Sequence, residues 1–255
     1  MDLNIGKQNF LILGASSGLG LAVAEKIQEE GGFTIVVARS EEKLNSFHLK
    51  HPNSKTIQAD IMSEDGINFL LQEVENFPIH GILVNAGGPP AGNFLGSTIE
   101  TWDKGYEMVF RWKAHLLLKI LPSLIERNYG RITFIESVSI KKPIEGLVLS
   151  NAYRMAVVGL VKSIINEING KDITLNIIGP GYHKTERLKN LIEKQAGSEK
   201  EKNEIEKTFA NQTAVGRLGI PEDLASLAVW LLSPHSGYVT GQTILVDGGL
   251  YKGSL

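Results

Sequence analysis

Residues 11–27 have the sequence LILGASSGLGLAVAEKI, in which a short apolar run leads through three glycines into a helix-like segment. Gly14, Gly18 and Gly20 lie in the expected strand-to-helix turn. Residues without a Cβ let the backbone of such a turn approach a diphosphate, and free N–H groups of the first helical turn point at it. Many such turns carry glycines for packing only, and the spacing is not the commoner G-x-G-x-x-G. The position after a first strand favours phosphate binding.

Short apolar runs and amphipathic segments alternate along the chain. Their near-continuous Val, Ile and Leu content indicates strands buried on both faces of a parallel sheet. The alternation predicts an α/β fold, a Rossmann-type doubly wound sheet of about seven strands, in a single domain over 1–255. The expected strands are 9–13, 33–38, 56–59, 81–84, 131–135, 173–178 and 243–246, and the expected helices are 18–30, 63–75, 101–128, 150–168 and 222–232.

One segment is compositionally unusual, because residues 189–212 are charged with sparse apolar residues at helical spacing. The segment can be interpreted as a solvated helical hairpin. Extended to 183–212, it can also be interpreted as a mobile helical lid over a site, and both interpretations can be true.

Composition excludes several classes of function. A formal net charge of -2 gives no electrostatic reason to expect nucleic acid or an anionic membrane as partner. With no cysteine, disulfides and thiolate chemistry are absent. His48 and His51 have no carboxylate cluster to complete a metal site, so no metal is expected. The start of the chain does not resemble a signal peptide, and no apolar stretch approaches a membrane span of about 18 residues. A soluble cytoplasmic protein is expected.

Further motifs follow the expected strands, at the sheet edge where ligands bind in such folds. Asp60 follows the third strand, where a carboxylate can accept from an adenine amino group. Asn85, Ala86 and Gly87 follow the fourth, where small residues let a cofactor lie flat.

Together these motifs resemble the short-chain dehydrogenases/reductases over nearly the whole chain. The similarity is carried by GASSGLG (14–20), NAG (85–87), GRITFIESVS (130–139), IIGPGYHKT (177–185) and the long segment 216–249. A subgroup similar to 3-oxoacyl-(acyl-carrier-protein) reductases shares NAGGPP, LSN..R and PGY..T. The resemblance implies a nicotinamide cofactor, a small-molecule substrate and a homo-oligomer, a dimer or usually a tetramer. The cofactor residues that it and the motifs indicate are Gly14, Ser16, Ser17, Gly18, Leu19, Gly20, Asp60, Ile61, Asn85, Ala86, Gly87, Pro180, Gly181 and Thr185.

The end of the second expected strand predicts NADP in preference to NAD. A carboxylate there would bind the ribose hydroxyls and repel a 2′-phosphate. This chain has Ala38 at that position, followed by Arg39 and Ser40. Arg39 can form a charge-assisted fork with the 2′-phosphate, and Ser40 adds a hydroxyl. A solvated arginine at a strand end is the alternative interpretation.

The active site that the resemblance implies is a serine, a tyrosine with a lysine four residues later, and an asparagine on the preceding helix. Ungapped register puts Ser137 at the serine, Ser150 at the tyrosine, Arg154 at the lysine and Val109 at the asparagine. Arg154 can hold the ribose and supply positive field, but it does not donate a proton.

The proton donor is left open among several groups. Tyr153, beside Arg154, is expected to donate the proton, with a packing role as the alternative. His183, Tyr182 and water are the other candidates. We therefore expect an NADP-dependent oxidoreductase that reduces a 3-oxoacyl-like or other ketone, or oxidises the matching alcohol, through Ser137, Tyr153 and Arg154. The alternative is an inactive cofactor-binding or sensor protein on the same fold.

Overall fold

The computed structural model describes residues 2–254, and within them seven parallel strands form one sheet. The strand order is β3-β2-β1-β4-β5-β6-β7, so the chain winds outward from β1 in both directions. The strands are β1 (Asn9–Leu13), β2 (Phe33–Ala38), β3 (Ser54–Gln58), β4 (Ile79–Val84), β5 (Gly130–Ile135), β6 (Ile173–Pro180) and β7 (Thr243–Val246). The Rossmann-type sheet expected from the sequence is confirmed, with each strand within two residues of its predicted ends.

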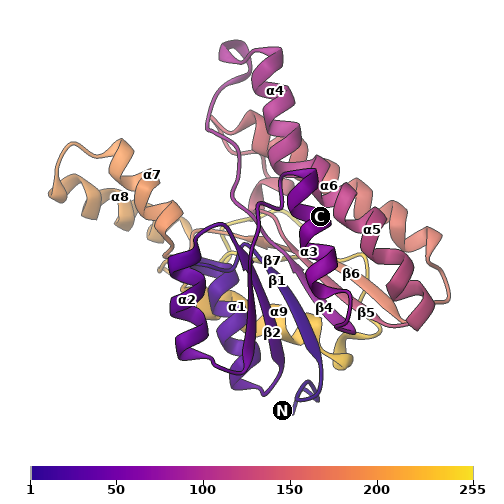
Figure 1. The fold of residues 1–255 in the computed structure, drawn as a ribbon. Coiled ribbons are helices and arrows are strands. Elements are labelled where there is room, and N and C mark those ends of the chain that lie inside the picture. Colours follow the sequence, from indigo (N-terminus) through magenta and orange to yellow (C-terminus); the bar gives the residue numbers. More distant parts are fainter. Residues whose placement is uncertain (1, 255) are drawn as a thin grey trace.

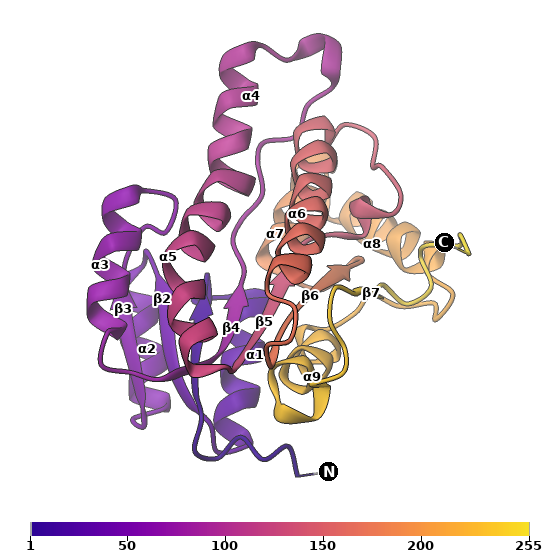
Figure 2. The ribbon, with the colours of Figure 1, turned by 90° about the vertical axis from the view of Figure 1, so that its right-hand side faces the viewer.

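Helices cover both faces of this sheet (Figures 1 and 2). One layer contains α1 (Gly18–Glu29), α2 (Glu41–Lys50) and α9 (Pro221–Leu232). The other contains α3 (Glu64–Val74), α5 (Trp112–Arg127) and α6 (Val148–Glu167). α4 (Ile99–Tyr106) continues into α5 through a π-helical turn at Glu107–Arg111 and extends beyond the sheet. The helix predicted at 101–128 is thus two α-helices joined by a π turn.

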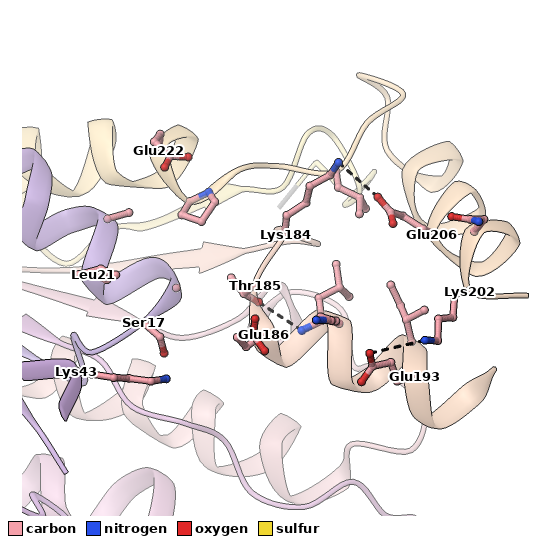
Figure 3. A pocket seen from close by; sticks show the side chains of 18 of the residues that line it. Ser17, Leu21, Lys43, Lys184, Thr185, Glu186, Glu193, Lys202, Glu206 and Glu222 are labelled. Carbon is pink, nitrogen blue, oxygen red and sulfur yellow. Dashed lines mark hydrogen bonds and ion pairs between the residues drawn. The ribbon is translucent and has the colours of Figure 1, made fainter. Parts of the chain in front are cut away.

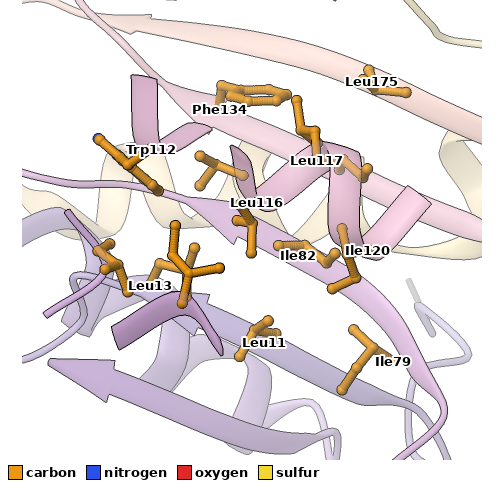
Figure 4. Packing of buried hydrophobic residues seen from close by; sticks show 14 of the residues in the cluster. Leu11, Leu13, Ile79, Ile82, Trp112, Leu116, Leu117, Ile120, Phe134 and Leu175 are labelled. Atoms are coloured by element: carbon orange, nitrogen blue, oxygen red, sulfur yellow. The ribbon is translucent and has the colours of Figure 1, made fainter. Parts of the chain in front are cut away.

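The core lies between the sheet and these helices. On the α5 side, Leu11, Ile82 and Phe134 from three strands meet Trp112 and Leu116 from the helix (Figure 4). Each of these side chains is at most 1% exposed. Burying a large apolar side chain contributes roughly 1.5–3 kcal/mol. This packing fixes α5 against β4 and β5, and thereby fixes the polar groups that α5 carries near the strand ends.

The α6 helix departs from one expectation. It has 20 residues and is long and apolar enough, by length and composition alone, to cross a membrane. The sequence interpretation that no apolar stretch approaches this length was therefore wrong. In the fold, Val157 and Val161 of α6 are fully buried in the core beside the sheet. Over the apolar window as a whole, 28% of the helix is buried.

The charged segment forms a helical hairpin, α7 (Glu186–Gln195) and α8 (Glu199–Gln212), which projects from one side of the sheet (Figure 1). Leu188 and Ile192 pack with Leu218, and the Tyr182 ring lies tilted against Phe209 with ring centroids 4.5 Å apart. These few apolar residues are separate from the main core. The hairpin interpretation is confirmed, and a lid role stays a prediction.

Candidate functional site

The glycine turn after β1 forms a close cradle that side chains would fill. Gly14 and Gly18 have positive φ angles of 60° and 58°. A Cβ on Gly14 would lie 2.4 Å from the Asn85 carbonyl oxygen, and one on Gly20 would lie 2.6 Å from the Gly14 carbonyl oxygen. The Asn85 side-chain amide donates to that same Gly14 oxygen at 2.9 Å. Asn85 therefore holds β4 and the glycine turn together.

The α1 helix begins at this cradle with its N-terminus open to a ligand. Its N-cap residue Ser17 makes no side-chain capping bond, and the first turn contains no acidic residue. The first backbone N–H groups of a helix have no partner within the helix. An uncapped N-terminus with the positive end of the helix dipole fits a diphosphate, and the glycine cradle gives its backbone access. Ser16, Ser17 and Leu19 are partly exposed around this point.

The ends of β2 and β3 carry the other predicted cofactor residues. Arg39 is exposed, and Ser40 is the N-cap of α2, whose hydroxyl accepts from the Lys43 amide at 3.4 Å. Asp60 accepts from the Met62 amide at 3.1 Å, and Ile61 is buried. Ser40 and Asp60 thus stabilise the local backbone through these hydrogen bonds, in addition to any contact with a ligand.

The end of β6 returns the chain to the glycine cradle. Gly181 lies so close to Asp247 that a Cβ would approach its Cα to 2.7 Å. Thr185 is the N-cap of α7, and its methyl group would lie 3.5 Å from a Cβ on Gly18. A cavity of about 820 Å³ opens here between α1 and the helical hairpin (Figure 3). Lys43, which the sequence interpretation did not single out, lines it.

The predicted catalytic positions meet at the ends of β5 and α6. Ser137 is partly exposed, and its hydroxyl accepts from the Ser139 amide at 3.1 Å as the N-cap of a short 3-10 turn. Arg154 is 6% exposed, and its Nε donates to the Ser150 hydroxyl at 3.0 Å. Ser150 and Arg154 therefore form a hydrogen-bonded pair one helical turn apart.

Two charged residues that the sequence analysis missed complete this cluster. The fully buried Glu136 carboxylate accepts from Arg154 Nη1 at 2.9 Å and from the Lys113 ammonium group through its other oxygen. Burial, and then the charge of Arg154, lower the pKa of Lys113, although Glu136 opposes the shift. We call Lys113, Glu136 and Arg154 the buried triad. It joins α5, β5 and α6 directly behind Ser137.

A signal for Lys113 was present in the sequence. Lys113 lies on the same helical face as Leu116, Leu117, Ile120 and Leu124, all of which are buried. A lysine that continues an apolar stripe at helical spacing is a candidate for a buried charge, which must be paired. Glu136 directly follows a fully buried strand, and this position marked it as a candidate partner for a buried lysine.

Comparison with known proteins identifies the family of the chain. The family model described as enoyl-(acyl carrier protein) reductase matches residues 14–251. The chain belongs to the short-chain dehydrogenases/reductases. It is 30% identical to a 3-oxoacyl-[acyl-carrier-protein] reductase of Haemophilus influenzae over 94% of this chain and 97% of the relative.

Solved structures of this family share the whole architecture. The L-sorbose reductase of Gluconobacter frateurii, complexed with NADPH and L-sorbose, is 25% identical with a TM-score of 0.92, covering 99% of this chain and 100% of that one. An actinorhodin polyketide ketoreductase with NADPH is 27% identical with a TM-score of 0.89, covering 96% and 97%. The chain is thus a member of a family of oxidoreductases whose structural neighbours include reductases bound to NADPH.

Within this short-chain dehydrogenase/reductase, Tyr153 leaves α6 on a different side from Arg154. Its hydroxyl donates to the Trp102 carbonyl at 2.9 Å, and its ring lies edge-on to Trp102 at 5.7 Å. Burial raises its pKa, and Asp103 and Tyr106 raise it further. The structure does not bring Tyr153 into the contacts shared by Ser150, Arg154 and Glu136. These contacts favour the packing role, while its proposed catalytic role stays a prediction.

His183, the alternative donor, is buried behind Gly219, whose Cβ position would be 2.7 Å from the imidazole ring. Its Nδ1 lies 3.3 Å from the Gly181 carbonyl oxygen, and its Nε2 has no partner within residues 2–254. Burial lowers the pKa of His183 from 6.5, so the imidazole is neutral at pH 7. Its neighbour Tyr182 packs against Phe209 of the hairpin.

Proposed function

We propose that this protein is an NADP-dependent oxidoreductase that reduces the carbonyl group of a small ketone, with 3-oxoacyl compounds as one candidate class, or oxidises the matching alcohol. The observation that carries the proposal is the glycine cradle, held by Asn85 and facing Thr185, with Ser137 and the buried triad at the adjoining strand end. Gly14 and Gly20 are required by close backbone contacts, and the turn that they form leaves the first N–H groups of α1 accessible to a dinucleotide diphosphate.

When bound, NADPH supplies a hydride to the carbonyl carbon. In our proposal the hydroxyls of Ser137 and Ser150 hold the carbonyl oxygen. Arg154 stabilises the negative charge that develops on that oxygen, acting through the hydroxyl of Ser150 from a site shielded from water. Preorganised charge of this kind is commonly worth several kcal/mol of transition-state stabilisation. Glu136 and Lys113 position Arg154 and do not touch the substrate.

The source of the proton is the point at which this site departs most from its family. Ser150 stands where the family has a tyrosine, and Val109, in the π turn before α5, stands where it has an asparagine. We assign protonation of the alkoxide to a water molecule that reaches it from the open side of the site, because Ser150 is only 3% exposed and is a poor acid. Tyr153, the donor expected from the sequence, would first have to leave the Trp102 carbonyl.

The preference for NADP rests on cations at the start of α2. Arg39 is exposed beyond β2, and Lys43 lines the large cavity from one turn further along (Figure 3). No carboxylate stands at the end of β2, where it would repel a 2′-phosphate. Both side chains can pair with that phosphate, which NADH lacks.

Self-association is part of the proposal. Exposed apolar side chains gather on the surface that α4, α5 and α6 share, among them Tyr106, Leu118 and Met155. A second copy of the chain would cover them in a homodimer or homotetramer. Light scattering coupled to size exclusion measures this directly, and a monomer at micromolar concentration would remove this part of the proposal.

The deciding experiment is a fluorescence titration with NADPH and NADH, followed by turnover of a ketone panel. We expect NADPH to bind at least about tenfold more tightly, equivalent to about 1.4 kcal/mol. Failure of both cofactors to bind would refute the function. Binding of NADPH without turnover of any ketone or alcohol would favour the second candidate, a cofactor-binding sensor, which the replacement of three family catalytic residues supports.

A further inference from the structure

A second arginine approaches the buried triad from the helical hairpin. Arg187, in the first turn of α7, brings both terminal nitrogens to within 2.6 and 2.7 Å of the point where Gly88 would carry a Cβ. Nη2 of Arg154 comes to within 3.0 Å of the same point. Two guanidinium groups from different elements therefore converge over Gly88, just after the cofactor motif at the end of β4.

The facing nitrogens of this arginine pair have no protein acceptor. Arg154 uses Nε and Nη1 for Ser150 and Glu136, and its Nη2 makes no hydrogen bond within residues 2–254. Arg187 makes neither a hydrogen bond nor an ion pair in the same described part of the chain. Arg154 is nine-tenths buried, whereas Arg187 is exposed. One end of the pair is thus rigid and the other opens to solvent.

Positively charged side chains outnumber carboxylates around Gly88, and this excess favours binding of an anion. Lys113, Arg154 and Arg187 are cationic groups, and Glu136 is the one carboxylate that the structure places in contact with them among the described residues. Although the residue as a whole is exposed, the enclosure of its guanidinium group by neighbouring atoms, and then the charge of Arg154, lower the pKa of Arg187. Like charges repel strongly where water is partly excluded, so an arrangement of this kind is stabilised when an oxyanion bridges the two forks.

We propose that Arg154 and Arg187 form an oxyanion-binding pair that holds a carboxylate on the substrate beside the carbonyl that is reduced. Arg154 contacts Ser150 and Glu136, and Glu136 is next to Ser137 in the sequence. The arginine pair therefore lies at the reacting end of the proposed site. Gly88 is required because any side chain there would occupy the space between the forks. The assignment to a substrate rests on the proposed function, whereas binding of an oxyanion does not.

The first test measures binding of malonate, which cannot accept a hydride. Isothermal titration uses the protein with and without saturating NADPH. We expect malonate to bind in both states. Arg187→Gln should weaken malonate binding by at least about tenfold, because it removes the charge-assisted hydrogen bonds of one of the two arginines. The matched control is Lys200→Gln on α8, which removes the same charge from the hairpin and should leave malonate binding unchanged.

Gly88→Ala provides a variant that keeps every charge. The atoms nearest to the added methyl would be the terminal nitrogens of Arg187, an exposed side chain that can move aside, and Nη2 of Arg154, and Gly88 does not have a positive φ. We expect an unchanged melting temperature together with malonate binding weakened at least about tenfold. Unchanged binding in both Gly88→Ala and Arg187→Gln would overturn the proposal, as would absence of malonate binding to the unaltered protein.

The same titrations show whether the arginine pair binds a carboxylate of the substrate or the diphosphate of the cofactor. If the pair held the diphosphate of the cofactor, NADPH would displace malonate, and Arg187→Gln would weaken NADPH and NADH alike. That result would overturn the substrate assignment. If the protein bound malonate but neither cofactor, the oxyanion pair would stand and the proposed function would fail. In kinetics, we expect Arg187→Gln to lower kcat/KM for acetoacetate at least about tenfold more than for methyl acetoacetate.

Discussion

Replacing Glu136 by Gln tests whether the buried triad organises this site. The side chains of Lys113, Glu136 and Arg154 are 3%, 0% and 7% exposed, so water cannot replace the lost charge. At the 2.9 Å separation of Arg154 and Glu136, the attraction is of the order of 6 kcal/mol for an effective dielectric of 20. Desolvation offsets part of this, and breaking a buried pair costs about 3–5 kcal/mol.

The loss should appear as a lower melting temperature. For a chain of this size, 1 kcal/mol corresponds to roughly 2–4 °C, so Glu136→Gln is expected to melt roughly 6–20 °C lower. Lys113→Met should cost less, because Glu136 keeps its bond to Arg154. The double variant should be more stable than Glu136→Gln alone, since only one unpaired cation remains.

The assay is thermal and urea unfolding at one fixed protein concentration, so that self-association does not change between variants. Glu126→Gln on the exposed side of α5 is the control, with an expected effect within about 0.5 kcal/mol. The reasoning would be refuted if Glu136→Gln lost less than about 1 kcal/mol. It would also fail if adding Lys113→Met made the loss larger.

Three further outcomes follow from single contacts. Tyr153→Phe should lower stability by about 1 kcal/mol through loss of the bond to Trp102, with turnover unchanged; a large loss of turnover would instead identify Tyr153 as the donor. Asn85→Ala should weaken NADPH roughly 5- to 10-fold in a fluorescence titration, because the glycine turn loses its 2.9 Å tether; unchanged affinity would contradict that role. Burial depresses the pKa of His183 below 6.5, so the unfolded chain binds more protons beneath that pH and stability must fall as acidity increases. His183→Gln should reduce this acid loss in pH-dependent unfolding, but an identical pH profile would show that His183 does not contribute.

The sheet was predictable because its strands are buried on both faces and therefore apolar almost without interruption. β1, β2 and β7 have the bounds that the sequence indicated. α2 was not predicted, because its sequence EEKLNSFHLK offers only Leu44 and Phe47 to the core. Its start is marked instead by the capping hydroxyl of Ser40, a signal that competed with the proposed phosphate contact.

The glycine cradle was predictable for a different reason. Its chemistry lies in one continuous stretch, where φ angles and close backbone contacts demand glycine at Gly14 and Gly20. The buried triad draws one residue from each of three elements, and no local spacing connects Lys113 with Glu136 and Arg154. Its recognition needs the packing of α5 and α6 against β5. The same holds for Arg187, which approaches Gly88 from the first turn of α7.

In the register that the family resemblance implies, Arg154 stands where the family has lysine, and the triad accounts for how that arginine is held. A guanidinium buried to this degree needs a carboxylate as its partner. Glu136, the residue directly before Ser137, provides that carboxylate. One carboxylate against one arginine would leave the site neutral. Lys113 adds a further positive charge from the opposite helix and shares the same carboxylate. When Lys113 is protonated the cluster therefore has a net positive charge next to Ser137, and that charge would stabilise both a developing alkoxide and a substrate carboxylate.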